Sequence, residues 1–199
     1  MRALGITYSG GFGIFATKGK AVRSPADMRG HKLQTDRFLR LTSYVQLLGV
    51  EPLSGPPEAF VPMSKLGYAD AVETTVARFD EYGDDRGTDV VNLTNHFLLT
   101  TMVIVNEKFF QGLPAKYQAK LKGLALETSR EERSLSIKAN EDGRKRLESR
   151  GVKFVDLTAE QRAAFAAVLK PIENAPWSFV GADWAQEIRA TRAVRTVSR

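Results

Sequence analysis

The chain has 199 residues, of which 43% are hydrophobic and 26% are charged. This composition is typical of a folded globular protein, and it excludes the low hydrophobicity and high net charge of a disordered chain. No apolar run approaches the roughly 18 residues that a membrane-spanning helix needs. The chain has no cysteine, which excludes disulfides, thiolate metal sites and a cysteine nucleophile. Its two histidines, His31 and His96, lie far apart in sequence, which argues against a histidine-rich metal site.

The net charge of +6 is concentrated at the carboxyl terminus. Residues 1–100 carry 11 basic and 11 acidic side chains, whereas residues 188–199 carry four arginines and no acid. A nucleic-acid binder usually carries its basic charge on a folded face rather than in a tail. We therefore predict a solvated basic tail over residues 188–199 and no nucleic-acid partner.

The amino terminus does not have the pattern of a signal peptide. Arg2 is followed by several glycines, and these interrupt the apolar core of about 7–15 residues that such a peptide needs. If Met1 is the true start, the sequence predicts a protein that stays in the cytoplasm.

Strand patterns alternate with helix patterns along the chain, which predicts an α/β fold with a mixed or parallel sheet. The predicted strands are residues 3–8, 12–17, 32–35, 68–73, 90–93, 98–105 and 152–155, with a loop at 9–11 between the first two. The predicted helices are residues 24–30, 37–48, 57–66, 114–150 and 158–170, followed by a weaker helical region around Trp177, Phe179 and Trp184. Residues 80–89 are predicted to form an acidic loop.

The helix predicted over residues 114–150 is unusually long, and it contains two glycines, Gly123 and Gly143, where it could bend. At about 1.5 Å per residue it would measure roughly 55 Å, which exceeds the diameter of a small domain. We therefore expect this helix to bridge two bodies or to belong to a larger one.

Two patterns superficially suggest ligand sites. Gly11, Gly13 and Ala16 fit the spacing of a dinucleotide-binding loop, but no helix pattern follows them to present its amino terminus to a pyrophosphate. The acidic residues between 80 and 89 lack the alternating ligands and central glycine of a calcium loop. We expect neither a nucleotide nor a calcium ion to bind at these places.

Asp70 and Glu73 are two carboxylates on one short predicted strand. As a general acid–base pair they would need a nucleophile or metal within reach, and the sequence offers no third partner. His96 follows a predicted strand, where it is either satisfied by backbone hydrogen bonds or faces a ligand crevice at the strand end. The residues alone leave those two alternatives open.

Three stretches occur in an order and spacing that resemble one protein family. They are SPADMRGHKL at residues 24–33, LLGVEP at 47–52 followed by ADAVET at 69–74, and LTNH at 93–96 followed by VIVNEKFF at 103–110 and Leu-Pro at 113–114. These stretches are similar to motifs of the solute-binding proteins of tripartite ATP-independent periplasmic (TRAP) transporters, the DctP type. The resemblance covers roughly residues 3–175.

The resemblance implies one lobe of a type II periplasmic-binding-protein-like fold with a long bridging helix. It implies a ligand-binding lobe over residues 1–113, the bridging helix over 114–150, a strand and helices returning to the lobes over 151–187, and the basic tail over 188–199. The match begins in the middle of the family's chain, so a first lobe and a signal peptide would be absent. In the family, two lobes close over a ligand held between them.

The resemblance also implies a site for a small organic solute, with no cofactor, no metal and no catalysis. The ligand-binding residues that it implies are Phe12, Gly13, Gln34, Glu73, Thr74 and His96. The family usually carries arginine where Gln34 and Gly13 stand, so we expect either a ligand less anionic than a C4-dicarboxylate or a degenerate site. We expect Gln34, Glu73 and His96 to share one concavity. Membrane permease subunits would be the partners, and the periplasm the location.

The alternative function is a stand-alone α/β protein-interaction module that uses the exposed lobe face and the basic tail. An enzyme that works through Asp70 and Glu73 is a third hypothesis, but the sequence offers it no nucleophile. The sequence predicts neither the identity of the solute nor the oligomeric state.

Overall fold

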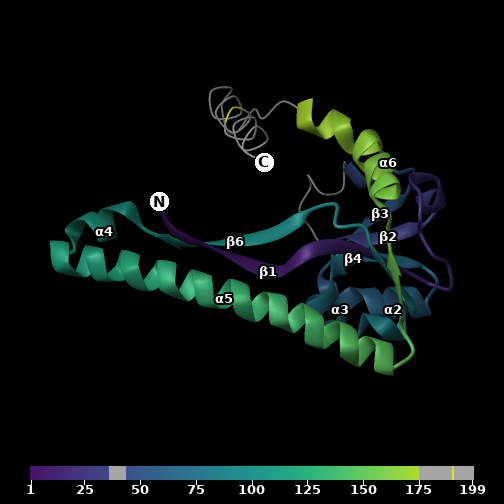
Figure 1. The fold of residues 1–199 in the computed structure, drawn as a ribbon, viewed down its shortest axis with the longest axis horizontal. Helices are drawn as coiled ribbons and strands as arrows, with labels where there is room; N and C mark the ends of the chain where they lie inside the picture. The colour runs from purple at the N-terminus through teal and green to yellow at the C-terminus, as the bar shows by residue number, and fades with distance from the viewer. Residues whose placement is uncertain (36–43, 175–189, 191–199) are drawn as a thin grey trace. The chain divides into compact units, whose positions relative to one another are not determined.

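The protein is described by a computed structural model that covers residues 1–35, 44–174 and 190 (Figure 1). It separates into two compact units, Met1–Val168 and Leu169–Arg199. The helix predicted over residues 37–48 lies mostly outside the described residues, although residues 44–46 are helical. The helical region predicted around Trp177, Phe179 and Trp184, and the tail apart from residue 190, also lie outside them. Among the described residues, no helix is long and apolar enough to cross a membrane.

The first unit is built on a seven-stranded mixed sheet with the order β3-β2-β4-β1-β5-β7, and β6 pairs with β1 off this path. Strand β1 is antiparallel to β4, β5 and β6, whereas β2 is parallel to β3 and β4, and β5 is parallel to β7. The strands are β1 (Arg2–Thr17), β2 (Lys32–Thr35), β3 (Glu51–Ser54), β4 (Ala71–Thr75), β5 (Val90–Leu93), β6 (Leu98–Val105) and β7 (Lys153–Asp156). The predicted α/β class with a mixed sheet is confirmed.

Helices connect these strands largely where the capping residues predict them. Ser24 and Asp27 form the predicted capping box, and Thr158 and Gln161 exchange the hydrogen bonds of a second one. The α-helices are α2 (Phe60–Lys65), α3 (Val76–Tyr82), α4 (Glu107–Gly112), α5 (Ala115–Ser149) and α6 (Ala159–Leu169). The short 3-10 helices are η1 (Pro25–Met28), η2 (Pro57–Ala59), η3 (Asp84–Arg86) and η4 (Lys170–Asn174). The long helix is confirmed as one unbroken element of 35 residues.

Two sequence predictions are wrong. The loop predicted at residues 9–11 is part of the continuous strand β1, because its backbone groups find partners outside the sheet, on α5. The acidic loop predicted over residues 80–89 begins inside α3 and continues as η3, because its acids contact arginines on α5 instead of staying solvated. Strand β3 and helix α4 were not predicted.

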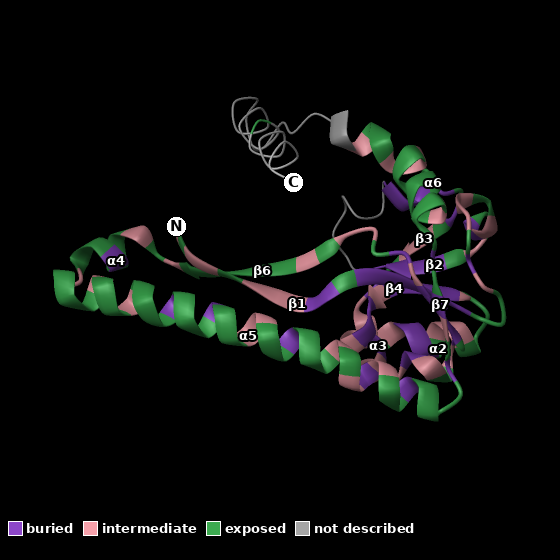
Figure 2. Ribbon diagram, in the orientation of Figure 1, coloured by how far each residue is buried: buried purple, intermediate pink, exposed green. Residues whose placement is uncertain are grey.

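The largest apolar cluster lies between the sheet and helices α2, α3 and α5. Ile14 and Ala16 of β1, Val72 of β4 and Val91 of β5 enter it from the sheet. The residues that cover them are Phe60 and Val61 of α2, Val76 and Phe79 of α3, and Leu147 of α5. Figure 2 shows this concentration of buried residues at the end of α5 near α2 and α3. Since side chains alternate along a strand, the neighbours of these strand residues point to the opposite face of the sheet.

Helix α5 lies directly against β1, and small residues allow the close approach. A Cβ atom on Gly5 would lie 2.2 Å from Ser129 Oγ and 3.0 Å from the carbonyl oxygen of Ala125. The buried positions of α5 recur at intervals of four and seven residues, which places them in one stripe along the helix: Ala125, Ser129, Ser136, Gly143 and Leu147. The sequence on both elements therefore specifies this contact.

A bulge in β1 is held by side chains of α5. The register between β1 and β6 skips Ser9 and Gly10, and Gly10 has a positive φ of 90°. The amide of Gly10 donates to Ser136 Oγ over 3.1 Å, and Asn140 Nδ2 donates to the carbonyl of Gly10. Asn140 Oδ1 in turn accepts from the amide of Ala77 in α3 over 2.9 Å. One asparagine thus links β1, α3 and α5.

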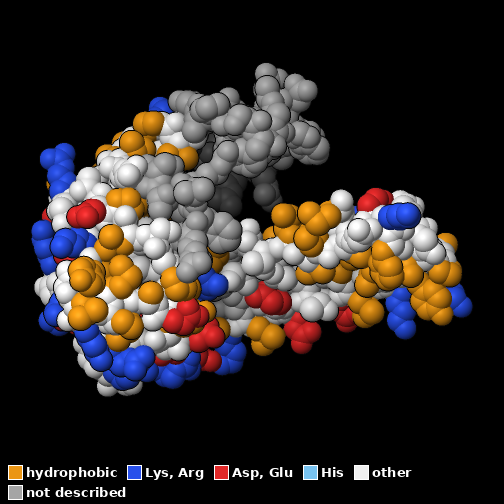
Figure 3. All heavy atoms as spheres, turned by 180° about the vertical axis from the view of Figure 1, so that it is seen from behind, with side chains coloured by type: hydrophobic (Ala, Val, Ile, Leu, Met, Phe, Trp, Pro, Cys, Tyr) orange, Lys and Arg blue, Asp and Glu red, His pale blue; other side chains and the backbone are white. Residues whose placement is uncertain are grey.

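The other face of the β1–β6 ribbon is apolar and exposed. Ile6 pairs with Met102, and Phe12 pairs with Leu98, across the two strands. Ile6 is 49% exposed and Met102 is 63% exposed. Figure 3 shows apolar side chains gathered on the surface over this part of the first unit. Exposed apolar surface of this kind is typical of an interaction face.

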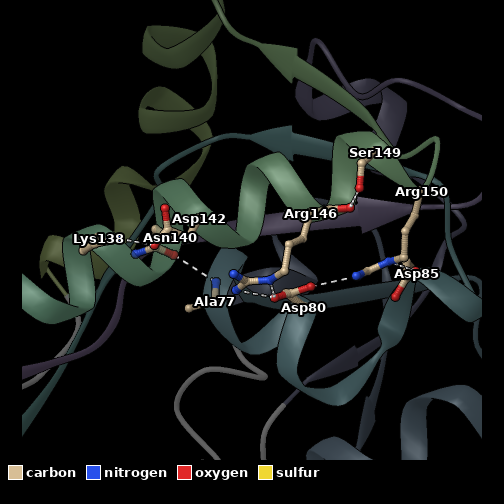
Figure 4. Close-up of polar contacts among 9 residues, drawn as sticks. All are labelled: Ala77, Asp80, Asp85, Lys138, Asn140, Asp142, Arg146, Ser149 and Arg150. Carbon is tan, nitrogen blue, oxygen red and sulfur yellow. Dashed lines mark hydrogen bonds and ion pairs between the residues drawn. The ribbon is translucent and has the colours of Figure 1, made fainter.

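An ion-pair network connects the end of α5 to α3 and η3 (Figure 4). Asp80 Oδ2 accepts from Arg146 over 2.7 Å, and Asp80 Oδ1 accepts from Arg150 over 2.7 Å. Arg150 Nε also donates to Asp85 over 2.8 Å. Burial by itself would raise the pKa of Asp80, but the hydrogen bonds from Arg150 and Arg146 outweigh it, so the pKa lies below 3.8. The network fixes α3 to the same end of α5 that closes the core.

We predict that Asp80→Asn destabilises the fold more than Asp85→Asn, because Asp80 pairs with two arginines and Asp85 with one. The difference in unfolding free energy should be about 1 kcal/mol at neutral pH, since the arginines are half-exposed. A carboxyl with a lowered folded-state pKa stabilises above its unfolded pKa and loses this contribution as the pH falls through the folded pKa. Urea unfolding at pH 7 and below pH 3.8 measures both effects; equal losses for the two variants would contradict the prediction.

Asp84 is a buried acid at the first position of η3. It is 2% exposed, and within the described part of the chain its Oδ1 has no hydrogen-bond partner. Burial raises the pKa of Asp84 to about 7, and the charge of Asp85 adds to this effect. The folded protein therefore holds a proton here that the unfolded chain releases at lower pH, so Asp84 reduces stability as the pH rises from about 4 to 7.

We predict that Asp84→Asn changes melting temperature in a pH-dependent way. Relative to the unsubstituted protein, the variant should gain several degrees between pH 4 and pH 8, because the amide cannot ionise. Glu81→Gln, an exposed substitution on α3, controls for the loss of one charge. Melting curves at several pH values provide the measurement, and a difference that does not vary with pH would contradict the burial of an ionising group.

Candidate functional site

Glu73 and His96 form a buried pair on the face of the sheet opposite the main cluster. Glu73 lies on β4 in register with Phe15 of β1, and His96 lies between β5 and β6. His96 Nε2 is 2.8 Å from Glu73 Oε1, and the side chains are 1% and 2% exposed, respectively. An ionised carboxylate only accepts hydrogen bonds, so Nε2 carries the proton of this bond.

Two hydroxyl groups complete the hydrogen bonds of the pair. Thr94 Oγ1 lies 2.7 Å from His96 Nδ1, and with Nε2 protonated it can donate to the neutral ring. The hydroxyl of Tyr44 donates to the same Glu73 oxygen that His96 contacts. The sharp turn between Thr94 and His96 places Asn95 at a φ of 50°, which asparagine tolerates better than most residues.

Aromatic rings surround His96 on three sides. Phe15 stacks on its ring at 4.1 Å and 10°, Tyr44 lies at 6.0 Å, and Phe97 meets it edge-on at 4.9 Å. Phe15 and Tyr44 are buried, whereas Phe97 is half-buried. We call these five residues and Thr94 the Glu73–His96 cluster: Phe15, Tyr44, Glu73, Thr94, His96 and Phe97.

This arrangement is suited to binding and positioning. The described residues contain no group of three or more His, Asp or Glu side chains that could hold a metal ion. Asp70 does not join Glu73 as a second carboxylate, because it accepts from the amide of Lys32 and lies 3.2 Å from His31 Nδ1. The acid–base pair considered from the sequence is therefore not assembled.

Gly13 lies beside the cluster and Phe12 does not. The amide of Gly13 donates to the carbonyl of Phe97 over 2.9 Å. Phe12, the next residue along β1, is 56% exposed and pairs with Leu98. Since adjacent strand residues point to opposite faces, Phe12 belongs to the exposed face of the ribbon.

Gln34 and Thr74 lie on the other face of the sheet from Glu73. Gln34 is in register with Val72 of the main cluster, and its Nε2 donates to the carbonyls of Gly55 and Pro56 over 3.2 Å each. Thr74 is in register with Ile14, which also enters that cluster. The expectation that Gln34 shares one concavity with Glu73 and His96 is therefore wrong for this conformation. Whether Gln34 and Thr74 contact a ligand stays a prediction.

Sequence reasoning found Glu73, His96 and Gly13 but missed the rest of the cluster. Tyr44, Thr94, Phe15 and Phe97 have no signal of their own, since aromatic residues in strands and helices usually belong to a core. The one available signal was the spacing of Thr94 and His96, whose side chains can meet across a single residue in a tight turn.

The sequence profile of bacterial extracellular solute-binding protein family 7, DctP, matches residues 1–176. The chain belongs to this family. A curated DctP relative, the C4-dicarboxylate-binding periplasmic protein of Rhodobacter capsulatus, is 25% identical over 198 residues. The match covers 97% of this chain and 59% of that relative.

Solved structures of DctP-like proteins share the fold. A TRAP periplasmic solute-binding protein from Ochrobactrum anthropi, with its carboxyl terminus bound in its ligand-binding pocket, matches with a TM-score of 0.88 and 20% identity, over 98% of this chain and 61% of that one. A protein from Roseobacter denitrificans with bound β-D-glucuronate matches at 0.79 and 21%, over 87% and 57%. The predicted periplasmic-binding-protein-like fold is confirmed, and this chain spans about three-fifths of the length of these relatives.

We predict that the buried contact between Glu73 and His96 is coupled in stability. His96→Ala should lower the unfolding free energy by about 3 kcal/mol, because it leaves a buried carboxylate without its ring donor. Glu73→Ala should have a loss of similar size, and Glu73→Gln, which keeps the acceptor oxygen, a smaller one. The double variant Glu73→Ala/His96→Ala should lose less than the two single losses combined. Urea unfolding measures the cycle, and purely additive losses would show that the pair does not interact.

Proposed function

We propose that this chain is the solute-binding component of a TRAP transporter, or the part of that component that this sequence spans. The observation that carries the proposal is the DctP family match over residues 1–176. The fold supports it, since solved solute-binding proteins of TRAP transporters align over most of this chain. The role is binding, which agrees with a cluster that offers hydrogen-bonding and aromatic groups without an assembled acid–base pair.

The proposed ligand is a small organic solute of the carboxylate type or a less anionic relative of it. Solved DctP-like proteins have been found with D-glucuronate, with D-galacturonate and with L-malate. This chain has Gln34 and Gly13 where the family resemblance implies arginines, so a charge-assisted pair with a ligand carboxylate is missing at both positions. A ligand with less negative charge than a C4-dicarboxylate fits these two substitutions better.

The Glu73–His96 cluster is the proposed ligand wall of this lobe. Its charged pair is buried beneath the half-buried ring of Phe97, so the pair orients the wall from behind in this conformation. Its partners would be the solute and the membrane permease subunits of the transporter, and its location the periplasm, as the name of the curated relative states for that protein.

A stand-alone interaction module remains the second candidate function, and one observation favours it. The β1–β6 ribbon presents an apolar face that includes Ile6, Phe12, Leu98 and Met102. A partner protein could bury this face. Pull-down experiments comparing the unsubstituted chain with Met102→Lys would separate this function from solute binding, because only the interaction module needs that face.

We predict that a small carboxylated or zwitterionic solute raises the melting temperature of this chain. A panel of L-malate, D-glucuronate and uncharged analogues at millimolar concentrations tests this, because a ligand that binds only the folded state stabilises by about 2.7 kcal/mol at a hundredfold excess over Kd. Met102→Ser, on the exposed face of β6, is a control that should leave the shift unchanged. If no compound shifts the melting temperature of the unsubstituted chain, the solute-binding function is contradicted.

A further inference from the structure

The ring of Phe97 occupies the space in front of Gly13. A Cβ atom on Gly13 would lie 2.2 Å from Cε1, 2.4 Å from Cδ1 and 2.6 Å from Cζ of that ring. Gly13 is not one of the glycines with a positive φ, so its backbone does not itself require glycine. The contact with Phe97 is therefore what excludes a side chain at residue 13.

The backbone holds Phe97 in this position. Gly13 donates its amide hydrogen to the carbonyl of Phe97 over 2.9 Å, and the next residues, Phe12 and Leu98, are paired in the ladder of β1 and β6. The ring of Phe97 also packs edge-on against His96. The ring therefore has backbone and side-chain contacts that oppose its displacement.

Phe97 is also the outermost ring around His96. Phe15 is fully buried and Tyr44 is 8% exposed, whereas Phe97 is half-buried. The side chains of His96 and Glu73 are 1% and 2% exposed. Of the three rings that contact His96, Phe97 is thus the one that a solute can reach.

We propose that Phe97 determines the specificity of this wall, an inference that rests on the proposed solute-binding function. Its ring presents an aromatic surface to the ligand, keeps the ligand from the Glu73–His96 pair, and leaves no volume for a cationic side chain at residue 13. The face of an aromatic ring carries partial negative charge, so it disfavours a carboxylate and favours the apolar or planar part of a solute. The wall therefore selects the uncharged portion of the ligand.

The steric step is tested by a double-mutant cycle on residues 13 and 97. Gly13→Ala should lower the melting temperature by several degrees when Phe97 is present and by less than half as much in the Phe97→Ala background. Gly123→Ala is a matched control, because Gly123 in α5 has nothing within 4 Å of its added Cβ atom, and it should not destabilise. Equal losses from Gly13→Ala in both backgrounds would overturn the proposal.

The specificity step is tested with L-malate as the probe. The variant Gly13→Arg/Phe97→Ala should bind L-malate at least about tenfold more tightly than Phe97→Ala alone, since a charge-assisted hydrogen bond contributes about 1.5–3 kcal/mol. Titration calorimetry on the full chain measures this. If the unsubstituted chain binds a solute from the panel but the double variant gains no affinity for L-malate, the role of Phe97 is wrong. If no variant binds any solute, the proposed function fails, and the stability cycle still decides the steric step.

Discussion

The contact between β1 and α5 is the constraint on which the rest of the first unit depends. Strand β1 changes partners along its length, pairing with β6 over its first part and with β4 and β5 over its last. At the bulge between these parts, Ser136 and Asn140 of α5 satisfy the backbone of Gly10. Without those bonds, buried polar groups would be left unpaired. One helix therefore keeps one strand continuous through two pairing environments.

The continuity of β1 places the proposed wall. Because the strand continues past the bulge in register with β4, Phe15 lies beside Glu73 and supports the ring of His96. Burying a carboxylate is costly unless hydrogen bonds compensate it, and Tyr44 and His96 both supply them. The same face carries Gly13, so the wall combines a buried charged pair with an aromatic exterior. This combination distinguishes the DctP-family site proposed here from a simple anion-binding pair of arginines.

Local sequence signals determined most of the fold. Apolar, β-branched runs gave strands at the predicted residues for β2, β5 and β6, and the capping boxes at Ser24 and Thr158 mark helix starts as expected. Strand β1 is different, because Ser9 and Gly10 carry a turn signal that α5, more than 120 residues away, overrides by hydrogen bonding. The acids of α3 and η3 likewise suggest a loop until Arg146 and Arg150 are brought to them.

The sequence by itself determined the α/β class, the long helix, the family resemblance and the importance of Glu73 and His96 as candidates. Only the tertiary structure decided which candidates meet. Side-chain alternation along β2 and β4 turns Gln34 and Thr74 away from Glu73, and a one-residue difference in register is invisible without the pairing partner. The partners Tyr44 and Phe97 were equally inaccessible, because their contacts with residues 29 and 84 positions away exist only after the sheet has formed.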